Sequence, residues 1–223
     1  MADRVDLTQA APIVQDMIAV IVDNSAWLSQ IDGAIGDGDH GVNMAKGFRL
    51  AAAKLAREDG FALQYGFLVL GDTLLSDIGG SMGPLYGTFF TEMAESLGEA
   101  EDLDGMRFQA MLRAGVAAVV DLGGAKPGDK SLIDVLVPAE DAFAAAQLDG
   151  TDLAGSLTRL REAAAAGLES TRDMVARIGR ASRLGERSRG TLDAGAASCT
   201  MLLTTLSDGL LARLGAIPEG TAP

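Results

Sequence analysis

Three aspartates in one glycine-rich segment are the residues of this sequence best suited to chemistry. Asp32, Asp37 and Asp39 lie in DGAIGDGDHG at 32–41, where the glycines permit positive φ and let the backbone turn several carboxylates inward. Carboxylate oxygens are the hard ligands that Mg²⁺ prefers, and Mg²⁺ completes its octahedron with water and substrate phosphates. The segment therefore predicts a site for a metal ion and a nucleotide.

The same segment is open to other interpretations. A solvated turn, with Asp37 or Asp39 capping the next helix, is the simplest alternative and stays open. Glycines also match GxGxxG, but a dinucleotide fingerprint needs a preceding strand and a loop without acids at the pyrophosphate. An EF-hand starting at Asp37 would need an acidic ligand twelve positions along, where Phe48 stands, so we reject both of these matches.

The only histidine, His40, directly follows Asp39. Its place in the loop, rather than on an apolar helix face, favours a role in the site over a role in the core. It could donate to a phosphate oxygen or orient Asp39. A phosphohistidine carrier is disfavoured because it would place a like charge beside three aspartates.

Three further glycine-rich loops contain residues suited to anions. In GGSMGP at 79–84, Pro84 takes a first-turn position and leaves free backbone N–H groups for an anion, with a plain helix–helix turn as the alternative. The segment 123–131 is a near miss to GxxxxGK[ST] without a preceding strand, so it is not a P-loop. Asp129 is placed to cap the helix that begins near Ser131.

The fourth loop, at 179–195, concentrates positive charge through Arg180, Arg183, Arg187 and Arg189. Guanidinium groups stabilise charge on a transferring phosphoryl group, so the loop suits a phosphate donor or an acidic partner. Four solvated arginines in a surface loop are the alternative.

Composition restricts the class of protein. Hydrophobic residues make up 48 %, yet no run approaches the roughly 20 apolar residues that span a membrane, and the N-terminus lacks a signal pattern. We therefore expect a soluble cytoplasmic protein with no membrane partner. The net charge of −13 argues against a nucleic-acid partner, and the single cysteine, Cys199, excludes an internal disulfide framework.

Apolar residues recur at helical spacing in eight stretches, while alternating β-branched runs are missing. The expected helices span 8–29, 42–57, 63–77, 84–97, 105–121, 131–146, 153–178 and 195–214. The glycine-rich loops follow the first, third, fifth and seventh helices, so all four emerge at one end of an up-and-down bundle. The sequence predicts a single all-α domain over 1–223, an antiparallel eight-helix bundle with its site at one end.

Four motifs resemble, in order and spacing, those of the L subunit of dihydroxyacetone kinases: GDGDHGVNM, GGSMGPLYGTFF, PGDKSLIDVLVP and GRASRLGERSRG. The resemblance covers nearly the whole chain and implies an antiparallel eight-helix barrel with an adenine nucleotide, ADP or ATP, at one mouth. Asp32, Asp37 and Asp39 match the family's metal ligands. The resemblance implies that they carry the chemistry by holding two Mg²⁺ ions against the phosphates.

The resemblance also implies which positions contact the nucleotide. These are His40, Gly41, Val42, Asn43, Ser81, Met82, Gly123, Leu132, Arg180, Leu192, Asp193 and Ala194. The chain departs from the family at four places, where it has Met82 for a usual Ser, Ser131-Leu132 for Thr-Met, Arg183 for Tyr and Ala194 for Pro. None of these changes removes a metal ligand.

In this family the ketose is held on a separate K subunit through a histidine of that subunit, so the resemblance implies a phosphotransferase that needs this partner. A stand-alone L chain favours bound ADP that a phosphotransferase-system protein rephosphorylates through a phosphohistidine. An ATP-using kinase of tetruloses such as erythrulose is the alternative. Two further functions also stay open: a nucleotide-sensing regulator without turnover, and a role like that of the nucleotide domain of fatty acid kinase. The protein could also be a homodimer.

Overall fold

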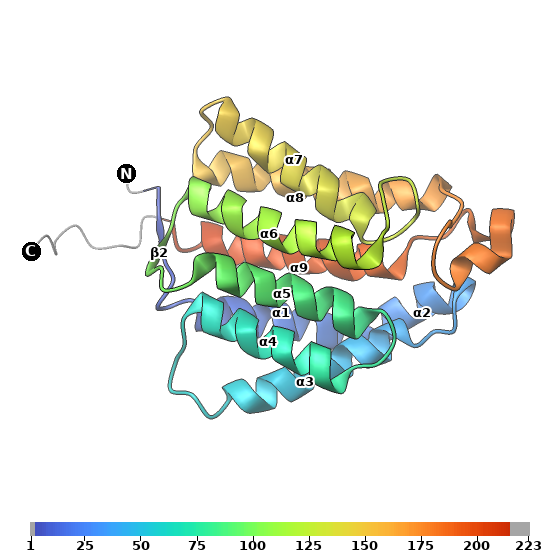
Figure 1. Cartoon of the computed structure of the whole chain (residues 1–223), viewed down its shortest axis with the longest axis horizontal. Helices are drawn as coiled ribbons and strands as arrows, with labels where there is room; N and C mark the ends of the chain where they lie inside the picture. Colours follow the sequence, from blue (N-terminus) through green and yellow to red (C-terminus); the bar gives the residue numbers. More distant parts are fainter. Residues whose placement is uncertain (1–2, 215–223) are drawn as a thin grey trace, which may run out of the picture.

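Nine α-helices and one pair of short strands form residues 3–214, the part of the chain that the computed structural model describes (Figure 1). The helices are α1 (Ala11–Asp23), α2 (Ser25–Ile35), α3 (His40–Leu55), α4 (Leu63–Asp77), α5 (Met82–Leu97), α6 (Gly105–Gly123), α7 (Ile133–Leu148), α8 (Leu153–Ser170) and α9 (Ala194–Leu211). The remaining elements are the 3₁₀ helices η1 (Thr171–Asp173) and η2 (Ala181–Ser188) and the antiparallel strands β1 (Val5–Asp6) and β2 (Asp102–Leu103). The predicted all-α class is confirmed.

Eight of these helices form a closed ring. From α3 to α9 each helix packs against the next one in the chain, and α1 packs against both α9 and α3. The short helix α2 packs against α3 and α9 at one end of the barrel (Figure 1). The ring agrees with the eight-helix barrel that the resemblance implies, with α2 as an additional helix.

The first predicted helix, 8–29, is two helices in the structure. The helix α1 ends at Asp23, and Asn24 separates it from α2. The side-chain amide of Asn24 donates to the carbonyl oxygen of Val20 at 2.8 Å. A side chain that bonds the backbone in this way competes with helical continuation, which accounts for the break.

The predicted helix 153–178 is shorter in the structure, because α8 ends at Ser170. The hydroxyl of Ser170 donates to the carbonyl oxygen of Gly167 at 2.6 Å, and that of Thr171 donates to Leu168 at 2.7 Å. These side-chain bonds engage carbonyl groups of the last helical turn, where the regular intrahelical bonding ends. The following chain is free to cross the end of the barrel instead of extending the helix.

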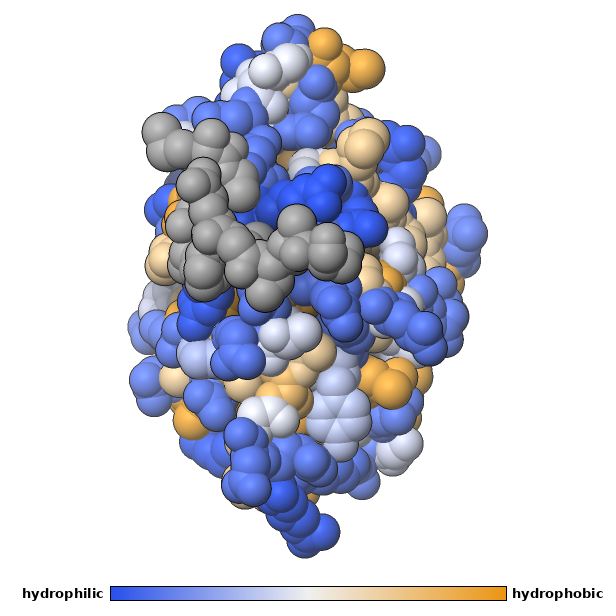
Figure 2. Space-filling model, turned by 90° about the vertical axis from the view of Figure 1, so that its left-hand side faces the viewer, coloured by the Kyte–Doolittle hydropathy of each residue, from blue (hydrophilic) through white to orange (hydrophobic). Residues whose placement is uncertain are grey.

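The helix connections divide between the two ends of the barrel. Four meet at the end on the right in Figure 1, and residues from all four line one pocket: 36–39, 78–81, 124–132 and 171–193. The visible surface of the opposite end is mostly hydrophilic (Figure 2). The prediction that the four glycine-rich loops share one end is therefore confirmed.

Aromatic side chains hold neighbouring helices of the ring together. Phe90 lies 5.5 Å from Phe67 and 6.2 Å from Phe48, measured between ring centroids, which joins α3, α4 and α5. Phe108 of α6 lies 4.6 Å from Phe143 of α7. All five rings are fully buried. Each such ring removes a large apolar area from water, so these contacts stabilise the packing of neighbouring helices.

Candidate functional site

The three aspartates lie together at the mouth of the pocket. Asp32 belongs to α2, Asp37 lies in the loop, and Asp39 immediately precedes α3. One carboxylate oxygen from each lies within 4.8 Å of the others. The loop turns sharply at Gly38, where φ is 77°, a conformation that favours glycine. The sequence placed Asp32 in the loop itself; that placement is wrong, because α2 continues to Ile35.

Three carboxylates this close repel one another unless a cation lies among them. Their oxygens are hard donors, and none of the three side chains is fully buried. This set suits Mg²⁺, which takes a few protein carboxylates and completes its octahedron with water and phosphate oxygens. The donor chemistry therefore fits a magnesium–nucleotide site.

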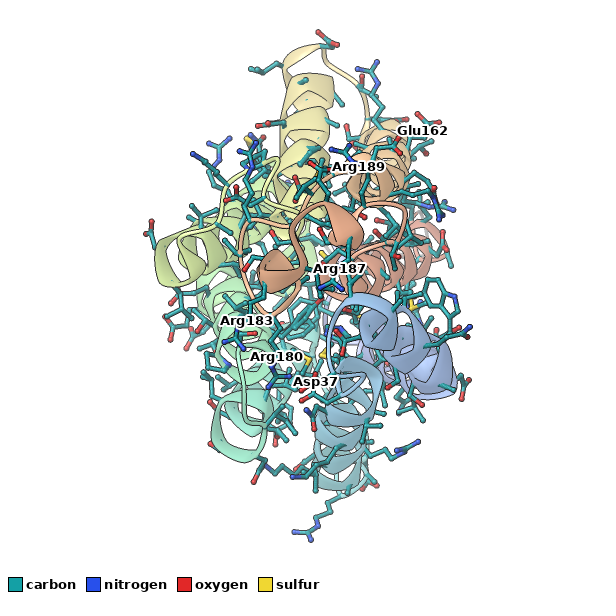
Figure 3. All side chains as sticks on the ribbon, turned by 90° about the vertical axis from the view of Figure 1, so that its right-hand side faces the viewer. Asp37, Glu162, Arg180, Arg183, Arg187 and Arg189 are labelled. Carbon is teal, nitrogen blue, oxygen red and sulfur yellow. The ribbon has the colours of Figure 1, made fainter. Side chains whose placement is uncertain are left out.

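Arg180 brings a positive charge to the aspartates. Its guanidinium forms an ion pair with Asp37, and its Nη1 lies 3.4 Å from Oδ2 of Asp39. Figure 3 shows Arg180 directly beside Asp37. Desolvation opposes ionisation of Asp37, but the hydrogen bond and charge of Arg180 outweigh it and hold the pKa of that carboxyl below its usual value.

The other three arginines of this segment, Arg183, Arg187 and Arg189, are not part of the pocket lining. In Figure 3, Arg183 lies near Arg180, while Arg187 and Arg189 lie farther from Asp37. The Nε atom of Arg189 bonds Glu186 at 3.1 Å on the protein surface. Only Arg180 of the four therefore reaches the aspartates.

A pocket of about 300 Å³ opens beside the aspartates. All four connections at this end of the barrel contribute to its lining. The lining residues singled out from the sequence are Asp32, Asp37, Asp39, His40, Ser81, Met82, Leu132, Arg180, Asp193 and Ala194. The fold therefore gathers residues from early, middle and late parts of the chain around one cavity.

Five residues expected at the nucleotide lie outside the pocket lining: Gly41, Val42, Asn43, Gly123 and Leu192. Gly41 packs tightly against α2, since a Cβ there would collide with the backbone of Ser25. The side chain of Val42 is 64 % exposed. The structure therefore shows close helix packing at Gly41 and solvent exposure at Val42.

The N-terminal end of α5 forms one wall of the pocket through Gly80, Ser81 and Met82. Gly80 has a φ of 75° and turns the chain into the helix, and no side chain caps this helix. Uncapped N–H groups in a first helical turn favour bound anions, because they carry the positive end of the helix dipole. This wall therefore suits a phosphate group.

His40 is buried, not free in the loop. Its Nε2 lies 2.8 Å from Oγ of Ser198, which in turn lies 2.7 Å from the hydroxyl of Tyr86. Burial lowers the pKa of His40 to about 4, although the charge of Asp39 opposes this shift. The imidazole is therefore neutral near pH 7. Sequence reasoning missed Ser198 and Tyr86, because their role depends on contact between α3, α5 and α9.

Asp193 connects the pocket to α9. Its side chain accepts a hydrogen bond from the backbone N–H of Ala196 at 2.7 Å and so caps this helix. Burial raises the pKa of Asp193 to about 6, against the lowering effect of that hydrogen bond. The cap fixes the start of α9, where Ala194 lines the pocket.

The connection between α6 and α7 differs from the sequence prediction. The expected cap at Asp129 is wrong, since its carboxylate accepts from the N–H of Lys126 at 3.0 Å. Asp134, inside the helix, accepts from the N–H of Ser131 at 2.8 Å. Sequence reasoning also missed Lys130, which is buried and lines the pocket. The sequence signal that could have identified Lys130 is its position in segment 123–131, which nearly matches a P-loop.

The fold and the site define an all-α protein with an acidic, phosphate-compatible pocket at one end of a helical barrel. Residues 34–208 match the family model of the DAK2 domain, so the chain belongs to the DAK2 domain family. None of the helices within 3–214 combines the length and apolar character needed to cross a membrane.

Several characterised proteins are similar to this chain. The ADP-binding subunit DhaL of the PEP-dependent dihydroxyacetone kinase of Escherichia coli (strain K12) is 37 % identical over 82 % of this chain and 87 % of its own length. DhaL of the PTS-dependent kinase of Lactococcus lactis is 36 % identical over 83 % and 88 %. L-erythrulose 1-kinase of Mycolicibacterium smegmatis is 36 % identical over 89 % of this chain but 35 % of its own length.

A solved structure shares the fold. The dihydroxyacetone kinase from C. freundii, crystallised in complex with AMP-PNP and Mg²⁺, superposes with a TM-score of 0.68 and 29 % identity. The match covers 89 % of this chain and 33 % of that kinase. This chain therefore corresponds to about a third of the crystallised kinase.

Proposed function

We propose that this chain is the nucleotide-binding subunit of a kinase for dihydroxyacetone or a related ketose. In this proposal a phosphoryl group passes from a bound adenine nucleotide to the ketose, which a separate K subunit holds. The observation that carries the proposal is the cluster of Asp32, Asp37 and Asp39, whose oxygens lie within 4.8 Å of one another beside the pocket. The similarity of this chain to ADP-binding DhaL subunits, over most of both chains, supports the same role.

We assign Asp32, Asp37 and Asp39 as ligands of two Mg²⁺ ions. When bound, such ions neutralise phosphate charge and orient the transferring group. The N–H groups at Ser81 and Met82 would hold phosphate oxygens, because they belong to an uncapped helix end in the pocket wall. The chain's contribution to catalysis is therefore positioning and charge stabilisation.

We assign the remaining lining residues to the rest of the nucleotide and to the shape of the pocket. Arg180 would add a guanidinium on the phosphate side, where it already pairs with Asp37. The others are His40, Leu132, Asp193 and Ala194. We also propose that a bound nucleotide extends beyond the pocket lining and contacts five further residues: Gly41, Val42, Asn43, Gly123 and Leu192.

We infer that ADP stays bound and is rephosphorylated by a phosphotransferase-system protein. The names of the E. coli and L. lactis relatives support this donor, and both match over nearly their full length. An ATP-dependent erythrulose-type kinase is the second candidate, because the erythrulose kinase of M. smegmatis is almost as similar. Because ATP and phosphotransferase-system donors both act in the cytoplasm, we propose a cytoplasmic protein. We also propose that residues 1–223 act as one domain.

Two linked measurements test this function. The protein is purified without added nucleotide and denatured, and the released small molecules are identified by chromatography. Stoichiometric ADP supports the rephosphorylated subunit, whereas an empty site that takes up Mg-ATP supports the ATP-dependent kinase.

The chain is then combined with a K subunit of this family and dihydroxyacetone or erythrulose. Either ATP or a PEP-driven phosphohistidine donor is supplied, and the phosphorylated ketose is measured. Product formation that Asp37→Asn abolishes supports the proposal. Nucleotide binding without product under any donor would indicate a regulator, and a chain that binds no adenine nucleotide with Mg²⁺ would overturn the assignment.

A further inference from the structure

Lys130 lies in the connection between α6 and α7, and its side chain is almost fully buried. Its φ of 64° makes it the one non-glycine residue within 3–214 with a left-handed backbone. This conformation is unfavourable for a residue with a Cβ and persists only where surrounding contacts impose it. We therefore expect Lys130 to be held in place by strong contacts with its surroundings.

The ammonium group of Lys130 has all its donors engaged. Its Nζ donates to the carbonyl oxygens of Ser188 and Thr191 at 2.6 Å each and to that of Met174 at 3.3 Å. A lysine ammonium has three donors, so none remains for a phosphate. This distinguishes Lys130 from the phosphate-binding lysine of a P-loop, which the sequence around it superficially matches.

All three acceptors belong to one segment, 174–193, which lies along the pocket. Apart from the 3₁₀ helix η2, this segment has no regular structure of its own. The same connection holds it a second time, since the N–H of Arg177 donates to the carbonyl oxygen of Asp129 at 3.0 Å. Arg180, which pairs with Asp37, belongs to this segment.

We propose that Lys130 is a positioning residue that clamps segment 174–193 to the α6–α7 connection and so holds Arg180 over the pocket. A buried ammonium is costly unless its donors are satisfied, so the lysine and the three carbonyl groups constrain one another. Removing the ammonium frees three carbonyls spread along the segment, which loosens the segment as a whole. The link to nucleotide binding rests on the proposed function, whereas the clamp itself does not.

Hydrogen exchange of the nucleotide-free protein tests the clamp directly. Lys130→Met keeps an unbranched side chain without the donors, and Lys126→Met changes an exposed lysine of the same connection as the matched control. We expect amides of 174–193 to exchange about tenfold faster or more in Lys130→Met, and at the wild-type rate in Lys126→Met. Wild-type exchange of this segment in Lys130→Met would overturn the clamp.

A second variant covers the case in which Lys130→Met does not fold. Lys130→Gly also removes the ammonium but relieves the left-handed strain, because glycine adopts positive φ without cost. The same faster exchange of 174–193 is expected, with the helices of the barrel unchanged. Unchanged exchange of this segment in Lys130→Gly would equally overturn the clamp.

Mg-ADP affinity, measured by calorimetry, separates positioning from a direct phosphate contact. Lys130→Met and Arg180→Gln should each weaken Mg-ADP binding about tenfold. The double variant should bind hardly more weakly than the single variant with the lower affinity, because both changes act through Arg180. Losses that multiply in the double variant would contradict positioning through Arg180. If the wild-type protein fails to bind Mg-ADP, the proposed function is wrong, and the exchange experiment still decides the clamp.

Discussion

Arg180 pairs with Asp37, a residue 143 positions earlier in the chain. The contact joins the segment after α8 to the loop before α3, the two segments that meet at the aspartate cluster. Both side chains are largely exposed, so the pair contributes little to the free energy of unfolding. Its importance lies in the charge that it places beside a candidate metal site.

Replacing Arg180 should therefore affect ligand binding far more than stability. For Arg180→Gln we expect almost no change in the free energy of unfolding, because ion pairs between exposed side chains contribute little to it. We expect Mg-ADP affinity to fall about tenfold, because the variant loses a charge-assisted guanidinium–phosphate contact. Arg183→Gln, outside the pocket lining, is the control. Equal losses in both variants would contradict a specific role for Arg180.

The aspartates should determine how many metal ions the protein holds. Mn²⁺ serves as a spectroscopic substitute for Mg²⁺, and bound ions are counted by electron paramagnetic resonance in the presence of ADP. We expect two ions for the wild type and fewer for Asp37→Asn, because an amide is a poorer ligand for a hard cation. Asp16→Asn on the exposed face of α1 is the control. Unchanged metal binding in Asp37→Asn would exclude this carboxylate as a ligand.

The sequence predicts the parts of the site that depend on local spacing. Asp37 and Asp39 stand two residues apart among glycines, and the glycine-rich loops alternate with helices, so their common end could be predicted. The contacts of Lys130 and the network of His40 with Ser198 could not be predicted, because they join segments far apart in the chain. The break at Asn24 was missed because apolar periodicity continues across it.

Gly41 illustrates this difference between local and long-range signals. The resemblance assigns it to the nucleotide, but a Cβ at this position would collide with the backbone of Ser25 in α2. We expect Gly41→Ala to destabilise the protein by about 1–3 kcal/mol in urea denaturation, because a backbone neighbour cannot move aside as a side chain can.

Gly79→Ala provides the control for Gly41→Ala. A Cβ at Gly79 would meet no atom within 4 Å, and its backbone is not left-handed. Its effect should stay within about 0.5 kcal/mol. If Gly41→Ala were as stable as Gly79→Ala, the close packing of α3 on α2 would be contradicted.

His40 should make the metal-free protein sensitive to acid. Its pKa is lowered from 6.5 to about 4 by burial, so below pH 6.5 the unfolded chain binds a proton that the folded protein does not. The neutral form therefore contributes stability above pH 6.5, and this contribution is lost as the pH falls toward 4. The loss between pH 7.5 and 4.5 amounts to about 2.5 kcal/mol.

His40→Gln lacks this titration and tests its effect. As the pH falls from 7.5 to 4.5, the wild type should lose about 2.5 kcal/mol of unfolding free energy relative to His40→Gln. Denaturant titration with EDTA present measures this difference. A difference that does not change with pH would mean that His40 titrates normally in the folded protein.

The most direct test of the central claim is a calorimetric titration of the nucleotide-stripped protein with ADP, performed with Mg²⁺ and then with EDTA. Because Asp32, Asp37 and Asp39 would repel bare phosphates, we expect binding at one site per chain with Mg²⁺ and at least about a hundredfold weaker binding with EDTA. Equal affinity under both conditions, or no binding with Mg²⁺, would contradict a nucleotide site built on these three carboxylates.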